Sequence, residues 1–515
     1  MVYTAITFAP VQGFIEKSRK LRDLYGSSFI LSFLAKAVCD AAKGELGEEA
    51  VVSPALLDVA RGTPNQIVIQ GNFAKGKARA ALDSAWHRVV DACRQWIEQQ
   101  VEANYTWKRE WHAWQNHAWE FFWGQGDSVT AARQAVNRQK HARDWTGINW
   151  MGESSTLSGT DAIAWPGMGR PRDPKAIALR ADDEEIQQFY QQLRDHPSLG
   201  AAFADEREQL SIPELVKRLV TYPVLAKPLG LPQRELPLSF SQTSQNQAPK
   251  FWFQGDGDRI GKYLQSLKDQ DEAEALRKFS TAMMHWGEDF LKPAVENQKI
   301  GAGETGRIIY AGGDDFLGVI YNADDDPKQF SPYRCLRWFC DFPEIWKQHK
   351  QNITVSVGAV LASPQVPQRD VLQHCREAEK SAKQRGRDRL ALRVLFRSGN
   401  HIEWVCPWGF LKDVMAGYCD RSGIQGAKAN WGHFLSDVAA LEARHGMGAS
   451  ATDSAVALAL FGLYFGAERQ HILETQAWGE AGIVHANCPA SQRPQALNQW
   501  VSNLAKVGFQ LCSNT

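Results

Sequence analysis

The chain has 515 residues, and its 58 lysine and arginine side chains balance 58 aspartate and glutamate side chains. This length predicts about three or four domains, and the balanced charge excludes a general electrostatic affinity for nucleic acid, so any RNA contact needs local patches or partner subunits. The nine cysteines form no Cys-x-x-Cys pair, and no signal peptide or membrane-spanning stretch is evident. A disulfide framework is thereby excluded, and we expect a cytoplasmic protein without a membrane partner.

The first 80 residues or so predict a small α/β unit. Strands are expected at Tyr3–Phe8 and Gln66–Gln70, with a helix at Arg22–Ala42 between them. Neither strand is followed by an acidic pair, so this unit is not expected to bind a metal ion. Ser18 and Arg19 lie at the strand-to-helix junction beside further basic residues. Two interpretations remain open: a triphosphate site without metals, or a helix cap with a solvated basic turn.

The segment from Trp86 to Trp150 is rich in tryptophan. Trp107, Trp111 and Trp114 recur at helical spacing, which predicts a helical insertion in the first domain. Tryptophan side chains can stack on bases, but at helical spacing they are typical of a core. Residues 151–175 then form a boundary rich in glycine, proline and serine, and the segment up to residue 240 is mostly helical in pattern.

The aromatic strand that begins at Phe251 ends in carboxylates. It leads into Asp256, Gly257 and Asp258, and a helix is expected to start at about Arg259 and offer free amides to an anion. A longer helix is expected at Glu272–Leu291. Carboxylates at a strand end next to glycines that admit phosphate suit magnesium and a nucleotide.

A tight hairpin turn follows. Gly312, Gly313, Asp314 and Asp315 stand between two apolar runs, and the glycines are expected to adopt backbone angles that other residues avoid. Two adjacent carboxylates on a stiff turn suit a divalent cation. Taken alone, the same residues are also ordinary turn residues.

The rest of the chain supplies a strand at Ile353–Val360, a basic helix that ends at Gly386 and carries Lys383, and then Arg387. Alone, such a helix is typical of a solvated face. The order strand, helix, hairpin, helix, strand, helix is the βαββαβ pattern. After Gly399 a helical pattern continues to the end, with the apolar stretch Ala455–Phe465 expected as a buried helix.

Residues 251–398 resemble the palm of GGDEF-type cyclases, with Asp314 and Asp315 in the third and fourth motif positions and Phe316 in the fifth. The later motifs of that superfamily match Ser356–Gly358, Ala382–Lys383 and Gly386–Arg387. The stretches Ile6–Ile15 and Ser18–Ser28 resemble the opening of the large subunit of type III CRISPR effector complexes, most closely the III-B branch. Pro64–Gln66 and Trp107–Trp123 fit the same family.

The resemblance implies an α+β fold with two ferredoxin-like palm domains, a helical insertion and a C-terminal helical bundle. The domains would span residues 1–150, 151–240, 241–398 and 399–515, the first palm having lost its metal carboxylates. Ser155–Gly159 resembles the family's zinc knuckle with both cysteines replaced by serine, a poor zinc ligand, so no zinc is expected. The chain has no His-Asp dipeptide, so the family's N-terminal nuclease is expected to be absent.

The resemblance also implies the site. Asp256, Asp314 and Asp315 would be catalytic and would hold two Mg²⁺ or Mn²⁺ ions, with Asp258 a further candidate ligand. The residues implied to contact ATP are Gly257, Asp258, Gly312, Gly313, Lys383, Arg387 and, in the first palm, Ser18 and Arg19.

The expected function is an RNA-activated nucleotidyltransferase that converts ATP to cyclic oligoadenylate. Its implied partners are other type III effector subunits, a guide RNA and a target RNA. Two alternatives stay open: a structural subunit of the same complex that no longer turns over, and a stand-alone diguanylate-type cyclase. Three acids kept in register argue against the first, and the double-palm layout argues against the second.

Overall fold

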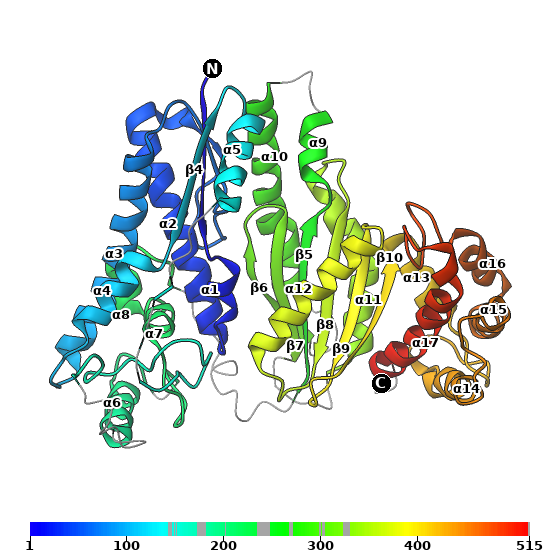
Figure 1. Cartoon of the computed structure of the whole chain (residues 1–515). Helices are drawn as coiled ribbons and strands as arrows, with labels where there is room; N and C mark the ends of the chain where they lie inside the picture. The colour runs from blue at the N-terminus through cyan, green and yellow to red at the C-terminus, as the bar shows by residue number, and fades with distance from the viewer. Residues whose placement is uncertain are drawn as a thin grey trace. The chain divides into compact units, whose positions relative to one another are not determined.

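A computed structural model describes residues 1–142, 147–148, 150, 152–171, 182–200, 202–233, 248–266, 271–297, 300, 304–322 and 330–512. Within these ranges the fold is mixed α+β, as predicted, and contains a four-stranded and a six-stranded sheet (Figure 1). The chain divides into two compact units. The first comprises Met1–Gln245 and Leu264–Met284, and the second comprises Asn246–Tyr263 and His285–Thr515.

The first unit is built on an antiparallel sheet with the strand order β2-β3-β1-β4. Its strands are β1 (Tyr3–Ala9), β2 (Val51–Ser53), β3 (Ile67–Gln70) and β4 (Glu120–Gly126). Its first helices are α1 (Gln12–Glu16), α2 (Leu21–Leu46), α3 (Lys75–Gln100), α4 (Lys108–His117) and α5 (Val129–His141). The strands and helix expected near the N-terminus are therefore confirmed.

Strand β4 was not predicted, because the tryptophan-rich segment was interpreted as wholly helical. Its sequence, Glu-Phe-Phe-Trp-Gly-Gln-Gly, is aromatic and pairs along its whole length with β1. Glycines let α5 approach this strand closely: a Cβ at Gly124 would lie 2.7 Å from the Cβ of Ala135. The core interpretation is confirmed for Trp107 and Trp111, which are fully buried with ring centroids 5.3 Å apart, whereas Trp114 is only partly buried.

Helix α2 is long and apolar enough to cross a membrane by length and composition alone, but 72% of its most apolar window is buried inside the fold. It is therefore the core helix of the first unit. Gly26 on this helix has no room for a side chain, because a Cβ there would lie 1.8 Å from the carbonyl oxygen of Lys217 on α7. The helices after α5 are α6 (Asp183–Asp195), α7 (Ile212–Leu219) and α8 (Pro223–Leu229).

A buried ion cluster joins α7 to the start of α2. The fully buried Arg218 guanidinium donates to Asp23 (Nε to Oδ1, 2.8 Å) and to Glu208 (Nη1 to Oε2, 2.7 Å). Burial opposes ionisation of Asp23, but the charge of Arg218 outweighs it and lowers the pKa of Asp23 to about 2. The Asp23 carboxylate also accepts the backbone N–H of Lys20 at 2.9 Å, which caps α2.

Helix α10 (Glu272–Trp286) lies between two strands of the second sheet in sequence, yet most of it packs in the first unit. The Glu272 carboxylate accepts the backbone N–H groups of Val129 (3.0 Å) and Thr130 (2.9 Å) at the start of α5. Ala273 and Leu276 belong to the same core cluster as the first sheet. The helix predicted at Glu272–Leu291 is thus present, and it continues beyond Trp286 as π-helical turns up to Asn297.

The second unit is built on a sheet with the strand order β10-β9-β8-β5-β7-β6, in which only β8 and β9 are parallel neighbours. Its strands are β5 (Lys250–Gly257), β6 (Glu304–Ala311), β7 (Asp315–Asn322), β8 (Val355–Ala362), β9 (Arg389–Leu395) and β10 (His401–Pro407). Its helices up to β9 are α9 (Ile260–Ser266), α11 (Pro332–Trp346) and α12 (Gln368–Arg385). Strands β6, β7, β5 and β8 repeat the second-third-first-fourth order of the first sheet.

The two faces of this sheet carry different side chains. Phe251 and Phe253 on β5 contact Phe339 of α11, with ring centroids 5.4 and 5.6 Å apart. Because side chains alternate along a strand, Asp256 points to the opposite face. Helix α12 packs on that face against β8, β9 and β5. The sheet therefore has an aromatic core on one side and the carboxylate-bearing end of β5 on the other.

The segment after residue 399 begins with a strand, which corrects the expectation of a purely helical pattern. His401–Pro407 pairs with β9 along its length, and the indole Nε1–H of Trp500 donates to the Val405 carbonyl at 2.7 Å. The helices that follow are α13 (Trp408–Gly417), α14 (Trp431–Ala443), α15 (Ala451–Phe465), α16 (Ala467–Gln476) and α17 (Arg493–Cys512). Helix α15 is only partly buried, since Leu463 is 74% exposed.

Candidate functional site

The predicted carboxylates meet at the end of two neighbouring strands. Asp256 near the end of β5 is the direct cross-strand partner of Asp315, the first residue of β7. Opposite residues in an antiparallel pair project their side chains to the same face. Asp314 precedes β7 in the turn, and its carbonyl accepts the backbone N–H of Gly257 at 3.0 Å. The hairpin therefore brings Asp256, Asp314 and Asp315 together, as the sequence predicted.

The glycines of this turn act differently from the prediction. Among the described residues, those with a left-handed φ do not include Gly312 or Gly313. The pairing of β6 with β7 shifts register between Ile308 and Tyr310, so an irregularity in β6 supplies the extra twist near the turn. Gly312 is buried.

Crowding of the carboxylates perturbs their ionisation. Loss of hydration, followed by repulsion from Asp256 and Asp315, raises the pKa of Asp314 to about 8. Loss of hydration and then repulsion from Asp256 raise the pKa of Asp315 to about 6, although the Asp315 side chain is itself exposed. The three acids thus lack a full counter-charge.

Lys383 supplies part of that charge from α12. Its Nζ forms an ion pair with Asp256 and a second with the Oε1 of Glu379, 2.6 Å away and one helical turn earlier. Burial alone would lower the pKa of Lys383, but these two carboxylates raise it. The predicted phosphate contact is therefore already beside the carboxylates, and α12 ends at Arg385 with Gly386 as its cap, as expected.

Asp258 lies in a different environment. It is 4% exposed, and both carboxylate oxygens accept hydrogen bonds from neighbouring segments. Arg387 remains 40% exposed, with its Nε 4.0 Å from Asp258 Oδ1. The expected role of Asp258 as a further metal ligand is therefore not favoured by its geometry.

The three carboxylates are candidate ligands for a divalent cation. Within the described part of the chain, no three His, Cys, Asp or Glu side chains are already arranged to hold a metal ion. The side chains of Asp256, Asp314 and Asp315 nevertheless offer only oxygen ligands, which Mg²⁺ prefers, and a cation would offset the repulsion that raises the pKa values of Asp314 and Asp315. These three residues therefore fit a divalent cation. Binding of that cation would require the ion pair between Lys383 and Asp256 to break.

The two candidates in the first unit are placed differently from each other. Ser18 is 1% exposed, and its hydroxyl donates to the Ile15 carbonyl at 2.6 Å. The Arg19 side chain is 45% exposed, with its Nε 3.9 Å from the buried Glu208. Arg19 can reach a ligand from this position, whereas Ser18 serves the local turn. Their roles toward ATP stay predictions.

Sequence reasoning missed two residues beside the carboxylates. Glu379 holds Lys383, and its one-turn spacing from the lysine was the available signal. Tyr310 on β6 has its pKa raised by burial and then by Asp315 and Asp256, which places its phenol near both. A single tyrosine in an apolar strand gave no signal.

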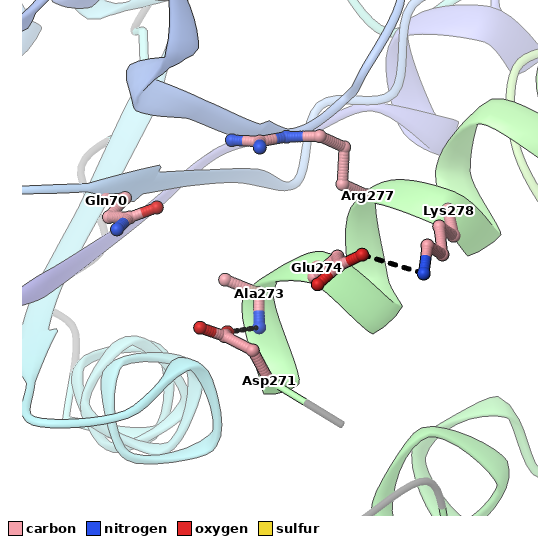
Figure 2. Close-up of a pocket in the computed structure, with 6 residues that line it drawn as sticks. All are labelled: Gln70, Asp271, Ala273, Glu274, Arg277 and Lys278. Atoms are coloured by element: carbon pink, nitrogen blue, oxygen red, sulfur yellow. Dashed lines mark hydrogen bonds and ion pairs between the residues drawn. The ribbon is translucent and has the colours of Figure 1, made fainter.

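The first unit has an open pocket of about 470 Å³ (Figure 2). It is lined by Gln70, Asp271, Ala273, Glu274, Arg277 and Lys278. Within the lining, Glu274 contacts Lys278 at 2.7 Å and Asp271 accepts the Ala273 N–H at 2.8 Å, while Arg277 pairs with Glu49. None of the predicted site residues lines it, so the carboxylate cluster remains the candidate site.

The family model for Cas10/Cmr2, second palm domain, matches residues 252–391, and the model for CRISPR-associated protein Cmr2, N-terminal, matches residues 3–102. The chain carries both of these Cas10/Cmr2 domains. The carboxylate cluster lies in the second palm domain. The resemblance to the large subunit of type III CRISPR effector complexes is thereby confirmed.

Solved structures agree in fold. The cryo-EM structure of type III-B Cmr-beta in the apo state matches at a TM-score of 0.57 with 10% identity, covering 97% of this chain and 81% of that one. An apo Csm1-Csm4 cassette matches at a TM-score of 0.51 with 13% identity, covering 99% and 70%. At these identities the likeness establishes the fold alone. No curated protein matches the chain.

Proposed function

We propose that this chain is the RNA-activated nucleotidyltransferase of a type III CRISPR effector complex and converts ATP to cyclic oligoadenylate in the cytoplasm. The observation that carries the proposal is the direct pairing of Asp256 with Asp315, with Asp314 beside them, at one strand end of a Cas10/Cmr2 second palm domain. An ordinary hairpin turn does not require three neighbouring acids, two of which have their pKa values raised by burial and mutual repulsion.

In this proposal Asp256, Asp314 and Asp315 hold two Mg²⁺ or Mn²⁺ ions. When bound, such ions activate the 3′-hydroxyl of one ATP and neutralise the pyrophosphate that leaves the other. The chain's own side chains hold the carboxylates in register and orient the triphosphate. Lys383 exchanges its ion pair with Asp256 for the triphosphate, and the exposed Arg387 adds a second positive charge.

The finer fold assignment belongs to the same proposal. The two sheets share one strand order, which supports two ferredoxin-like palms, the first without metal acids. The helices α13 to α17 would form a C-terminal domain that contacts other effector subunits, while guide and target RNA provide the activating signal. Ser155 and Ser158, both buried, lie with their hydroxyl oxygens 3.3 Å apart where the family's knuckle would hold zinc, which supports a site without zinc.

One observation favours a second candidate, a structural subunit without turnover. Lys383 already neutralises Asp256, and the described acids are not arranged around a common ion. A palm that never binds a metal would gain stability from such a pair.

The test uses the assembled complex with guide RNA. ATP, or GTP as the competing nucleotide, is added with Mg²⁺, with and without cognate target RNA, and the products are identified by mass spectrometry. Cyclic oligoadenylate that appears only with target RNA supports the proposal. No product under any condition supports the structural subunit, and a cyclic guanylate made without RNA supports a stand-alone cyclase.

A further inference from the structure

The turn between α12 and β9 has an unusual backbone. Gly386, Arg387 and Asp388 have φ values of 143°, 65° and 50°, so two consecutive non-glycine residues are left-handed. This region is unfavourable for L-residues, and such turns persist only where surrounding contacts hold them. Two cations are expected at the triphosphate: Lys383 lies just before this turn, and Arg387 lies within it.

Asp258 holds the turn from the strand side. Its Oδ2 accepts the backbone N–H of Asp388 at 3.0 Å and the Thr354 hydroxyl at 2.9 Å. Its Oδ1 accepts the Ser356 hydroxyl at 2.8 Å, and its own N–H donates to the Thr354 carbonyl at 2.8 Å. One buried carboxylate thus joins the end of β5, the start of β8 and the turn.

A second set of contacts closes the turn from the C-terminal region. The buried Arg389 donates from Nε to the Arg387 carbonyl at 2.8 Å and from Nη1 to the Ile483 carbonyl at 3.5 Å. The Ala486 N–H donates to the Arg385 carbonyl at 2.8 Å. A Cβ at Gly386 would lie 2.1 Å from the Arg389 guanidinium, so this position leaves no room for a side chain.

We propose that Asp258 is a positioning residue for nucleotide binding: it fixes the Gly386–Asp388 turn and so sets Arg387 and Lys383 against the carboxylate cluster. The proposal deepens the nucleotidyltransferase function and rests on it. It separates Asp258 from its neighbour Asp256 by role. Both oxygens of Asp258 accept hydrogen bonds from hydroxyl and amide donors, and Asp258 does not coordinate metal. Asp256, in contrast, directs an oxygen at the ammonium group of Lys383.

The test compares Asp258→Ala and Asp258→Asn in the assembled complex. The asparagine carbonyl can still accept from Asp388, and serine and threonine hydroxyls can reverse their direction, so Asp258→Asn retains most of the turn. We expect Asp258→Ala to raise the KM for ATP about tenfold with a smaller change in kcat, and Asp258→Asn to raise it less. The Mg²⁺ dependence of turnover should stay as in the wild type.

Asp420→Asn and Asp420→Ala are the matched controls. Asp420 is a 5% exposed carboxylate of the same unit that accepts three backbone N–H groups, from Ser422, Ile424 and Asn430. These variants should lower the melting temperature as much as the Asp258 variants without changing the KM for ATP. Equal KM changes in both sets would reduce Asp258 to a stability role and overturn the proposal.

Two further measurements separate this proposal from the function on which it rests. Direct binding of a non-hydrolysable ATP analogue needs no turnover, and amide hydrogen exchange at Arg387 to Arg389 reports the turn itself. Faster exchange and weaker binding in Asp258→Ala support the proposal. Unchanged binding in that variant, with the wild type binding normally, overturns this proposal alone. No binding by the wild type overturns the proposed function together with it. A shifted Mg²⁺ dependence would make Asp258 a ligand instead.

Discussion

The two sheets of this protein share a strand order but differ in what stands at the corresponding strand ends. In the second sheet the first strand ends with Asp256, and the third begins with its partner Asp315. In the first sheet, β1 ends at Ala9, and Asn65 lies just before β3. The Asn65 amide donates to the Thr7 hydroxyl and to the Phe8 carbonyl, each at 3.0 Å.

The difference teaches that a palm-like strand order provides a position but not a chemistry. At this position the first sheet places a neutral amide that satisfies β1 and needs no ligand. The second sheet places acids that repel one another and need a cation, which Lys383 supplies in part. The charge balance at the corresponding strand ends therefore distinguishes the two sheets.

The largest effect is expected from removing carboxylates at the strand end of the second sheet. Asp314→Ala combined with Asp315→Ala should abolish cyclic oligoadenylate formation in the assembled complex with either Mg²⁺ or Mn²⁺. Asp314 lies in the turn and Asp315 is the exposed first residue of β7, so both contribute little core packing, and thermal melting, complex assembly and RNA binding should be retained. Normal product yield from the double variant would contradict the two-metal assignment, and loss of folding together with activity would leave an ordinary hairpin turn as the better interpretation.

The next effect concerns Lys383, the cation that pairs with Asp256. Lys383→Ala should raise the KM for ATP about tenfold, because a charge-assisted contact to the triphosphate is worth about 1.5–3 kcal/mol. Lys380→Ala, on an exposed position of the same helix, is the control and should change the KM little. An unchanged KM in Lys383→Ala would return the lysine to a purely structural partner of Asp256.

The sequence predicted the carboxylate cluster better than the Gly386–Asp388 turn beside it. The positions of Asp256, Asp314 and Asp315 follow from local strand and hairpin patterns, which a linear sequence records. The role of Asp258 depends on hydroxyls of Thr354 and Ser356, almost a hundred residues away in the chain, which only the register of β5 with β8 brings close.

The same difference between local patterns and contacts distant in the chain applies to the first unit. The sequence leaves the basic turn at Ser18 and Arg19 open between a triphosphate site and a helix cap, because no local pattern indicates that the buried Glu208 lies beside Arg19. Strand β10 was missed for a related reason, since its place depends on pairing with β9 and on Trp500 from the last helix. Local order could be predicted, whereas long-range partners could not.

One substitution tests the neutral amide of Asn65 at the strand end of the first sheet. Asn65→Asp replaces a donor with a carboxylate that faces the Phe8 carbonyl, so the free energy of unfolding should fall by about 1–3 kcal/mol at neutral pH. The loss should be smaller in acid, where the new carboxyl is protonated and donates again. Gln66→Glu, at the exposed neighbouring position, should change stability by less than about 0.5 kcal/mol. Equal stability of Asn65→Asp and the wild type would mean that the first sheet tolerates the charge.

The smallest expected effect is the pH dependence of the metal-free acidic end. Burial and repulsion raise the pKa of Asp314 to about 8 and that of Asp315 to about 6, above the ordinary value of 3.8. The folded state therefore binds more protons than the unfolded state between about pH 4 and pH 8, and stability falls as the pH rises through this window. Water screens the exposed Asp315, so we expect an effect on the order of 1 kcal/mol, or about 2–4 °C in melting temperature.

Mg²⁺ should restore this loss, and should do so more at pH 8.5 than at pH 5, because it competes with protons for the same oxygens. The Asp314→Ala, Asp315→Ala variant should lack both the pH slope and the Mg²⁺ response. A Mg²⁺ effect of equal size at both pH values, or one that persists in the variant, would place the metal elsewhere.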